Sequence, residues 1–159
     1  KSFIKSLAGP TIKVLGNQNN EQVTSLMESC RAYVYAGVED FGIAPVEAMA
    51  AGAPVIALGK GGLLDTVRCA RKGLSSATGV LFSEQNVSSL VEAVNWFEEN
   101  KLWRTLDPES INNWANRFSP DAFKIRFSKV LSSAWNHHQR SCAGDSSDPA
   151  DMSELVLGN

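Results

Sequence analysis

Two glutamates, Glu39 and Glu47, stand on either side of a glycine-containing turn at residues 37–42. The segment after the turn, residues 43–51, is helical in composition, and Pro45 is tolerated in a first helical turn. The free N–H groups at the start of such a helix, together with its dipole, suit an anion such as phosphate. Carboxylates beside that anion would repel it unless they accept hydrogen bonds from hydroxyl groups. The pattern therefore describes a diphosphate between two polyols, which is a nucleotide sugar.

A second interpretation of the turn needs no ligand. Asp40 or Glu39 could fold back onto the N–H groups of the following helix and cap it. This interpretation explains Asp40 more easily than it explains both glutamates, because Glu47 is expected in the first turn or so of the helix, at the same end of the sheet. The two interpretations differ in whether the helix end is open or filled by its own chain.

The elements that would position this turn alternate between strands and helices. Short, mostly apolar runs predict four strands, at residues 12–15, 32–36, 54–58 and 79–82. Helices are expected from Asn20, over 43–51, near Leu63, from Asn86, from Pro108 and from Pro120 to about His138. Continuous apolar strands between helices indicate a parallel sheet covered on both faces. We therefore predict an α/β fold, a doubly wound Rossmann-like parallel sheet flanked by helices.

The run from Glu39 to Gly62, EDFGIAPVEAMAAGAPVIALGKGG, resembles the E-x7-E signature of the retaining family-four (group 1) glycosyltransferases. Besides the two acids, Phe41-Gly42 and the pair Gly61-Gly62 stand at the spacing of this family. The resemblance extends more loosely from Ile12 to His138. These enzymes have the GT-B architecture, in which two Rossmann-like domains face each other across a cleft. The resemblance implies that this chain is the C-terminal, donor-binding domain, in incomplete form.

The resemblance also implies a role for each residue that matches the motif. Glu39 is expected to be catalytic and to contact hydroxyls of the transferred sugar, which the backbone of Phe41 and Gly42 also contacts. The backbone of Ile43 and Ala44 is expected to contact the diphosphate, and Glu47 the ribose. Gly61 and Gly62 are possible loop contacts. Members of the family transfer a glycosyl group from a nucleoside diphosphate sugar to an acceptor hydroxyl with retained configuration. They need no metal or other cofactor, because protein groups stabilise the departing diphosphate.

Several features of this reaction stay open at the level of sequence. The donor is GDP-mannose or a UDP-sugar, and the acceptor is a glycan, a lipid or a small molecule. In this family, an Arg and a Lys that neutralise the diphosphate lie upstream of the strand expected here at 12–15. The residues before Lys13 do not match the motif in which that pair occurs. The N-terminal Rossmann-like domain is missing from this sequence, and the helix from Pro120 resembles the family's closing helix, which packs toward that domain. The alternative is a non-catalytic nucleotide-sugar-binding fragment or degenerate module, while the E-x7-E run weighs against an epimerase or phosphorylase.

Bulk properties narrow the class of protein further. The 159 residues have a formal net charge of −2, which argues against a nucleic-acid-binding surface. There is no apolar run of about 18 residues that would predict a membrane span. The three cysteines are far apart, which favours reduced thiols and a cytoplasmic or cytosol-facing location over a metal site. We divide the chain into a partial nucleotide-sugar-binding domain at 1–139 and a disordered acidic tail at 140–159.

Some residue types outside the motif have ordinary structural explanations. Four tryptophans are expected to pack between helices instead of forming a platform for sugars: Trp96, Trp103, Trp114 and Trp135. Lys60 lies beside the expected diphosphate site, but a solvated loop lysine explains it as well.

Overall fold

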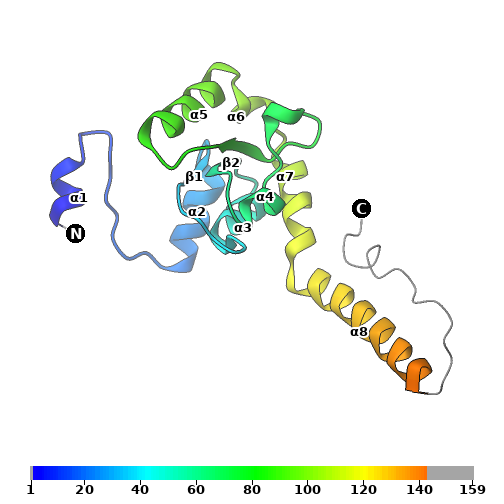
Figure 1. The fold of residues 1–159 in the computed structure, drawn as a ribbon. Coiled ribbons are helices and arrows are strands. Elements are labelled where there is room, and N and C mark those ends of the chain that lie inside the picture. The colour runs from blue at the N-terminus through cyan, green and yellow to red at the C-terminus, as the bar shows by residue number, and fades with distance from the viewer. Residues whose placement is uncertain (1, 143–159) are drawn as a thin grey trace.

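A computed structural model describes residues 2–142 of the chain (Figure 1). The expected acidic tail at 140–159 lies outside the described residues, except that 140–142 belong to the last helix. In this part of the chain three parallel strands form one sheet in the order β1 (Tyr33–Tyr35), β2 (Val55–Leu58) and β3 (Gly79–Phe82). The prediction of an α/β fold with a parallel sheet is confirmed.

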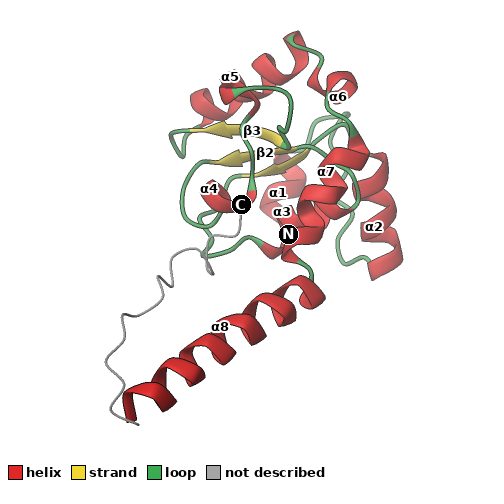
Figure 2. Ribbon diagram, turned by 90° about the vertical axis from the view of Figure 1, so that its right-hand side faces the viewer, coloured by secondary structure: helices red, strands yellow, loops and turns green. Residues whose placement is uncertain are grey.

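Helices cover both faces of this sheet (Figures 1 and 2). The helices are α1 (Ser2–Leu7), α2 (Asn20–Ser29), α3 (Ile43–Ala50), α4 (Leu63–Thr66), α5 (Val87–Glu99), α6 (Leu102–Thr105), α7 (Pro108–Ala115) and α8 (Pro120–Cys142), with 3₁₀ turns η1 (Ala70–Lys72) and η2 (Asn116–Phe118). Helices α5 and α6 lie on one face, and α2, α3 and α7 lie on the other. The turn that follows β1 leads into α3, which belongs to the second of these layers.

The core is centred on β2, whose four residues are all buried, as a continuous apolar run predicts for a central parallel strand. Met49 of α3, Phe97 of α5 and Ile111 of α7 are each at most 1% exposed and pack around this sheet. Helix α3 also packs along α7. The helix that follows the glycine turn is thus anchored along its length, which fixes the position of its first residues.

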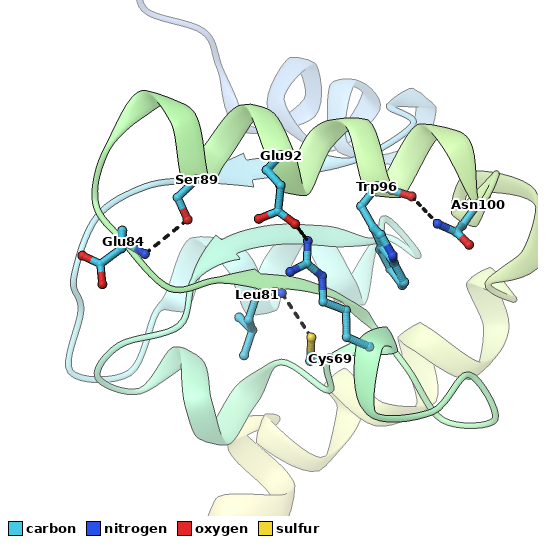
Figure 3. A network of polar contacts seen from close by, with 8 residues as sticks. Cys69, Leu81, Glu84, Ser89, Glu92, Trp96 and Asn100 are labelled. Carbon is cyan, nitrogen blue, oxygen red and sulfur yellow. Dashed lines mark hydrogen bonds and ion pairs between the residues drawn. The ribbon is translucent and has the colours of Figure 1, made fainter.

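Side-chain caps define where α5 and α7 begin. The Asn86 side chain accepts a hydrogen bond from the backbone N–H of Ser89 at 2.8 Å, and Asp107 does the same for Ser110 at 2.9 Å. Further bonds tie down the ends of α5 (Figure 3): Glu84 N–H donates to Ser89 Oγ at 3.3 Å, and the amide of Asn100 donates to the Trp96 carbonyl at 2.8 Å. Both helices begin where the sequence predicts.

The strand expected at residues 12–15 is wrong. Ile12, Val14 and Leu15 are 58%, 37% and 51% exposed, and the segment between α1 and α2 forms no strand. In Figure 1 this segment runs outside the helices and the sheet, away from β1. A strand needs a neighbour to accept its backbone hydrogen bonds, and composition alone does not provide one. Helix α2 then begins with Asn19, not Asn20, as its cap, in a capping box with Gln22.

The tryptophans divide into two groups. Trp96, Trp103 and Trp114 are half-buried against the core, as expected. An arginine lies over each of these rings: Arg68 is 3.6 Å from the centre of Trp114, Arg31 is 4.1 Å from that of Trp103 and Arg71 is 5.2 Å from that of Trp96. Trp135 contradicts the expectation, because it is 59% exposed on α8.

Helix α8 extends away from the rest of the molecule (Figures 1 and 2). It runs to Cys142 instead of ending near His138. Four large apolar side chains recur at every fourth position along it, and each is more than half exposed: Phe123, Phe127, Leu131 and Trp135. Helical spacing places these side chains on one face, which we call the α8 apolar stripe.

Candidate functional site

The turn after β1 packs directly against the glycine loop after β2. Gly62 N–H donates to the Glu39 carbonyl at 2.8 Å, and Glu39 also forms an isolated parallel bridge with Gly61. A Cβ atom on Gly62 would lie 2.3 Å from the Asp40 carbonyl oxygen and 2.5 Å from Phe41 Cα, so this close approach of two backbones requires glycine. The two turns form one edge at the carboxyl ends of β1 and β2, where open parallel sheets bind ligands.

Helix α3 begins immediately after this turn, with Gly42 at its N-cap. Gly42 has a φ of 85°, in the left-handed region that glycine adopts readily. Among the described residues, none caps α3 with its side chain. The structure therefore does not contain the self-cap by Asp40 or Glu39, and the positive end of the α3 dipole faces outward at this edge.

A pocket of about 310 Å³ lies at this helix end, lined by Tyr35 and by residues 39–45; we call it the helix-end pocket. It brings together five of the residues that the sequence analysis assigns to the sugar and the diphosphate: Glu39, Phe41, Gly42, Ile43 and Ala44. Glu39 and Phe41 are exposed, whereas Gly42 and Pro45 are buried. The pocket thus combines a helix N-terminus with an accessible carboxylate.

One residue of the helix-end pocket was missed by the sequence analysis. The Tyr35 hydroxyl donates a hydrogen bond to Oε1 of Glu39. This hydrogen bond is the main cause of the raised pKa of Tyr35. Desolvation and the electrostatic effects of Glu39 and Tyr33 raise this pKa further. The signal in the sequence is weak, because it consists only of a tyrosine at the end of a strand, four positions before the acid.

Glu47 lies in a different pocket. A cavity of about 480 Å³, the side pocket, is lined by Glu47, Ala50 and Ala51 next to α3 and by residues of α2: Asn20, Val23, Thr24, Met27 and Glu28. Glu47 is the fifth residue of α3, one turn beyond its start. The two glutamates therefore line separate pockets, contrary to the expectation that they converge on one. Burial and the nearby charge of Glu47 raise the pKa of Tyr33, which places this carboxylate close to the start of β1.

The glycines of the neighbouring loop do not line the helix-end pocket. Gly61 and Gly62 instead hold the loop against the turn that carries Glu39. Lys60, in the same loop, is exposed. A third pocket, of about 450 Å³, lies beside η1 and includes Arg68, Lys72 and Ser75 in its wall.

The described part of the chain, residues 2–142, also bears on metal binding and on membranes. No group of three or more His, Cys, Asp or Glu side chains in this part of the chain is arranged to hold a metal ion. None of its helices combines the length and the apolar character needed to cross a bilayer.

The parallel three-stranded sheet flanked by helices matches the GT-B fold. The family model for glycosyl transferases group 1 matches residues 3–118, and the chain belongs to this family. Among curated proteins, the chain is similar to the alpha-1,3/1,6-mannosyltransferase ALG2 of Homo sapiens, with 31% identity over 124 residues, which cover 77% of this chain and 28% of that protein.

A solved structure gives an independent comparison of the fold. The sucrose-phosphate synthase of Thermosynechococcus elongatus superposes with a TM-score of 0.67 at 22% identity, over 86% of this chain and 33% of that one. At this identity the likeness shows the GT-B fold alone. The chain spans about a third or less of the length of both proteins.

Proposed function

We propose that this chain supplies part of the donor site of a retaining glycosyltransferase, which transfers a hexose from a nucleoside diphosphate sugar to an acceptor hydroxyl. The observation that carries the proposal is the helix-end pocket, where the uncapped start of α3 and the Glu39 carboxylate share one wall. The helix end attracts the diphosphate through its N–H groups and its dipole. Glu39 accepts hydrogen bonds from sugar hydroxyls, which makes its negative charge compatible with a phosphate nearby.

The two pockets divide the donor between them in this proposal. The sugar contacts Glu39 and the backbone of Phe41 and Gly42, while the diphosphate lies against Ile43 and Ala44. The nucleoside continues along α3 into the side pocket, where Glu47 accepts hydrogen bonds from the ribose. Both carboxylates are exposed, each lines one of the two pockets, and Glu47 lies about one helical turn beyond the start of α3, which supports this placement.

The chemistry proposed for the site is electrostatic. The leaving group is a nucleoside diphosphate, whose negative charge grows as the bond to the sugar breaks. Donors at the start of α3 are fixed in place before the reaction, so they stabilise that charge without reorganising. We propose that the transfer uses no metal ion or other cofactor for this step.

The similarity to a named mannosyltransferase supports GDP-mannose as the first donor to test, with a UDP-sugar as the second. The acceptor is a glycan, a lipid or a small molecule. We further propose that the donor site faces the cytosol.

The second partner in the proposal is another Rossmann-like domain, which supplies the acceptor side of the cleft. The α8 apolar stripe supports it, because four large apolar side chains more than half exposed on one helix face favour burial against a partner. The matched parts of this chain also cover only 28% and 33% of the two relatives, so most of each relative lies outside the match.

One observation favours a second candidate, a non-catalytic nucleotide-sugar-binding module. Within the described part of the chain, no Arg or Lys lines the helix-end pocket. A cation would help to neutralise the leaving diphosphate, so binding without efficient transfer is the alternative outcome.

Binding and transfer test the proposal separately. Calorimetric titration of the 159-residue chain with GDP, GDP-mannose, UDP and UDP-glucose identifies the donor. Glu47→Gln should weaken binding of the nucleotide and of its sugar form by about tenfold each, because both carry the ribose. Glu39→Gln should weaken only the sugar form, and in a protein with both domains it should strongly depress transfer. Glu99→Gln, at the far end of α5, is the control.

The outcomes distinguish the two candidates. Wild-type binding without transfer in the two-domain protein would favour the non-catalytic module. If wild type binds none of the four probes, or if both pocket variants behave like Glu99→Gln, the proposed donor site is wrong.

A further inference from the structure

Tyr35, the last residue of β1, and Glu39 face each other across the turn that opens the helix-end pocket. Both side chains line that pocket, and the Tyr35 hydroxyl donates to one carboxylate oxygen, Oε1. A carboxylate has two oxygens with about four acceptor sites. A donor held on one oxygen therefore restricts the rotation of the carboxylate and leaves the second oxygen available to a ligand.

From this geometry we propose that Tyr35 is a positioning residue, which orients the Glu39 carboxylate toward the donor sugar. The inference rests on the function proposed above and deepens it, because it adds a residue that acts on the sugar through Glu39. A glutamate side chain has several rotatable bonds, and freezing them costs free energy when the ligand binds. Orientation by Tyr35 lowers that cost, since the carboxylate is already held before the sugar arrives.

The backbone between the two residues is shaped to allow this contact. A Cβ atom on Gly37 would lie 2.7 Å from the Tyr35 hydroxyl oxygen and 2.9 Å from its Cζ. The tyrosine ring therefore lies over the backbone of Gly37, in space that any side chain would occupy. Gly37 is not among the glycines with positive φ, so the lack of a side chain, not an unusual backbone, is what the contact requires.

The protonation states agree with this role. The raised pKa of Tyr35, caused chiefly by its hydrogen bond to Glu39, keeps the proton on the phenol at neutral pH. The phenol is then a donor and the carboxylate an acceptor. The other ionisable groups near Tyr35 are Tyr33, which is neutral at this pH, and Asp40, which lines the same pocket.

Tyr35→Phe in the complete chain tests the proposal through a difference between two ligands. The ligand is GDP-mannose, or UDP-glucose if wild type prefers it. In calorimetric titration, Tyr35→Phe should bind this sugar nucleotide about five- to tenfold more weakly than wild type does. It should bind the matching nucleoside diphosphate as tightly as wild type does. In a Glu39→Gln background the same change should have no further effect, because the partner of the hydroxyl is already altered.

Gly37→Ala provides a second, independent variant. The added methyl group displaces the tyrosine ring while the hydroxyl remains, and it should reproduce the loss seen with Tyr35→Phe. A purely structural role predicts a different result, in which Tyr35→Phe lowers the melting temperature and weakens the nucleoside diphosphate and its sugar form equally. That equal loss would overturn the proposal.

A spectrophotometric titration separates failure of this inference from failure of the proposed function. In a Tyr33→Phe background the remaining tyrosine is Tyr35, and its pKa should fall toward the ordinary value of about 10 when Glu39→Gln is added. An unchanged pKa, or sugar-nucleotide binding that Tyr35→Phe leaves unchanged, would overturn the positioning role alone. Failure of wild type to bind any probe would instead overturn the proposed function, and this inference with it.

Discussion

The packed α/β body, residues 33–118, and helix α8 place similar side chains in opposite surroundings. Phe97 of α5 and Phe127 of α8 are both helical phenylalanines, yet the first is 1% exposed and the second is 54% exposed. In the body, apolar stripes on the helices meet the sheet or each other. In the part of the chain that the structure describes, α8 contacts η2, and all four side chains of the stripe stay more than half exposed.

This difference shows what an apolar pattern does and does not determine. The pattern specifies which side chains gain free energy from burial, but not which surface covers them. The family model matches residues 3–118, which include the body, and it ends just before α8 begins. The body therefore lies within the part of the chain that carries the family's fold, and α8 is the part whose partner we propose to be a second domain.

The largest expected effect separates the two regions directly. Phe97→Ala should lower the free energy of unfolding by about 3–5 kcal/mol, because it leaves a cavity in a closely packed core. Phe127→Ala, a matched change on α8, should alter it by less than about 0.5 kcal/mol. Urea denaturation followed by circular dichroism measures both. Comparable losses for the two variants would mean that α8 is packed in solution, and the contrast drawn above would be wrong.

A smaller effect is expected where two loops of the body meet at the site. Gly62→Ala places a methyl group against the backbone of Asp40 and Phe41, and the crowding should destabilise the chain by about 1–3 kcal/mol. Gly9→Ala is the control, because a Cβ there would meet nothing within 4 Å. Thermal denaturation of both variants tests this, and equal melting temperatures would show that the two loops are not in contact.

The smallest effect concerns the cap of α7. Hydrogen bonds from the hydroxyl and backbone N–H of Ser110 hold the pKa of Asp107 below its ordinary value. Because the pKa is lower in the folded state, the stabilisation is complete above the unfolded-state pKa of about 4 and is lost as pH falls through the folded value. Asp107→Asn should flatten the decline in stability below about pH 4. Identical pH profiles for the variant and wild type would exclude this contribution.

The sequence predicted those elements whose signals are local. The caps at Asn86 and Asp107, and the continuous run of β2, each contain the information that forms the element. Residues 12–15 have strand composition as well, but a strand forms only beside a partner, and that partner is not encoded nearby. The prediction that Trp135 packs between helices fails for the same reason, because burial of a helix face depends on a distant surface.

The candidate site follows the same division. Residues 39–45 are contiguous, so the sequence predicted that they gather at one helix end. The separation of Glu47 from Glu39 depends on how far one helical turn carries a side chain and on the position of α2 beside it. The contact between Tyr35 and Glu39 depends on ring orientation over Gly37, which no spacing rule expresses.

The most direct test of the account is a nuclear magnetic resonance titration of the 159-residue chain with GDP-mannose and with UDP-glucose. The central claim predicts that the backbone amide signals of Gly42, Ile43 and Ala44 shift most, followed by those around Glu47. The shifts should fit binding of one ligand molecule per chain. Shifts confined to the pocket beside Arg68 and Lys72, or no shifts with either nucleotide sugar, would contradict it.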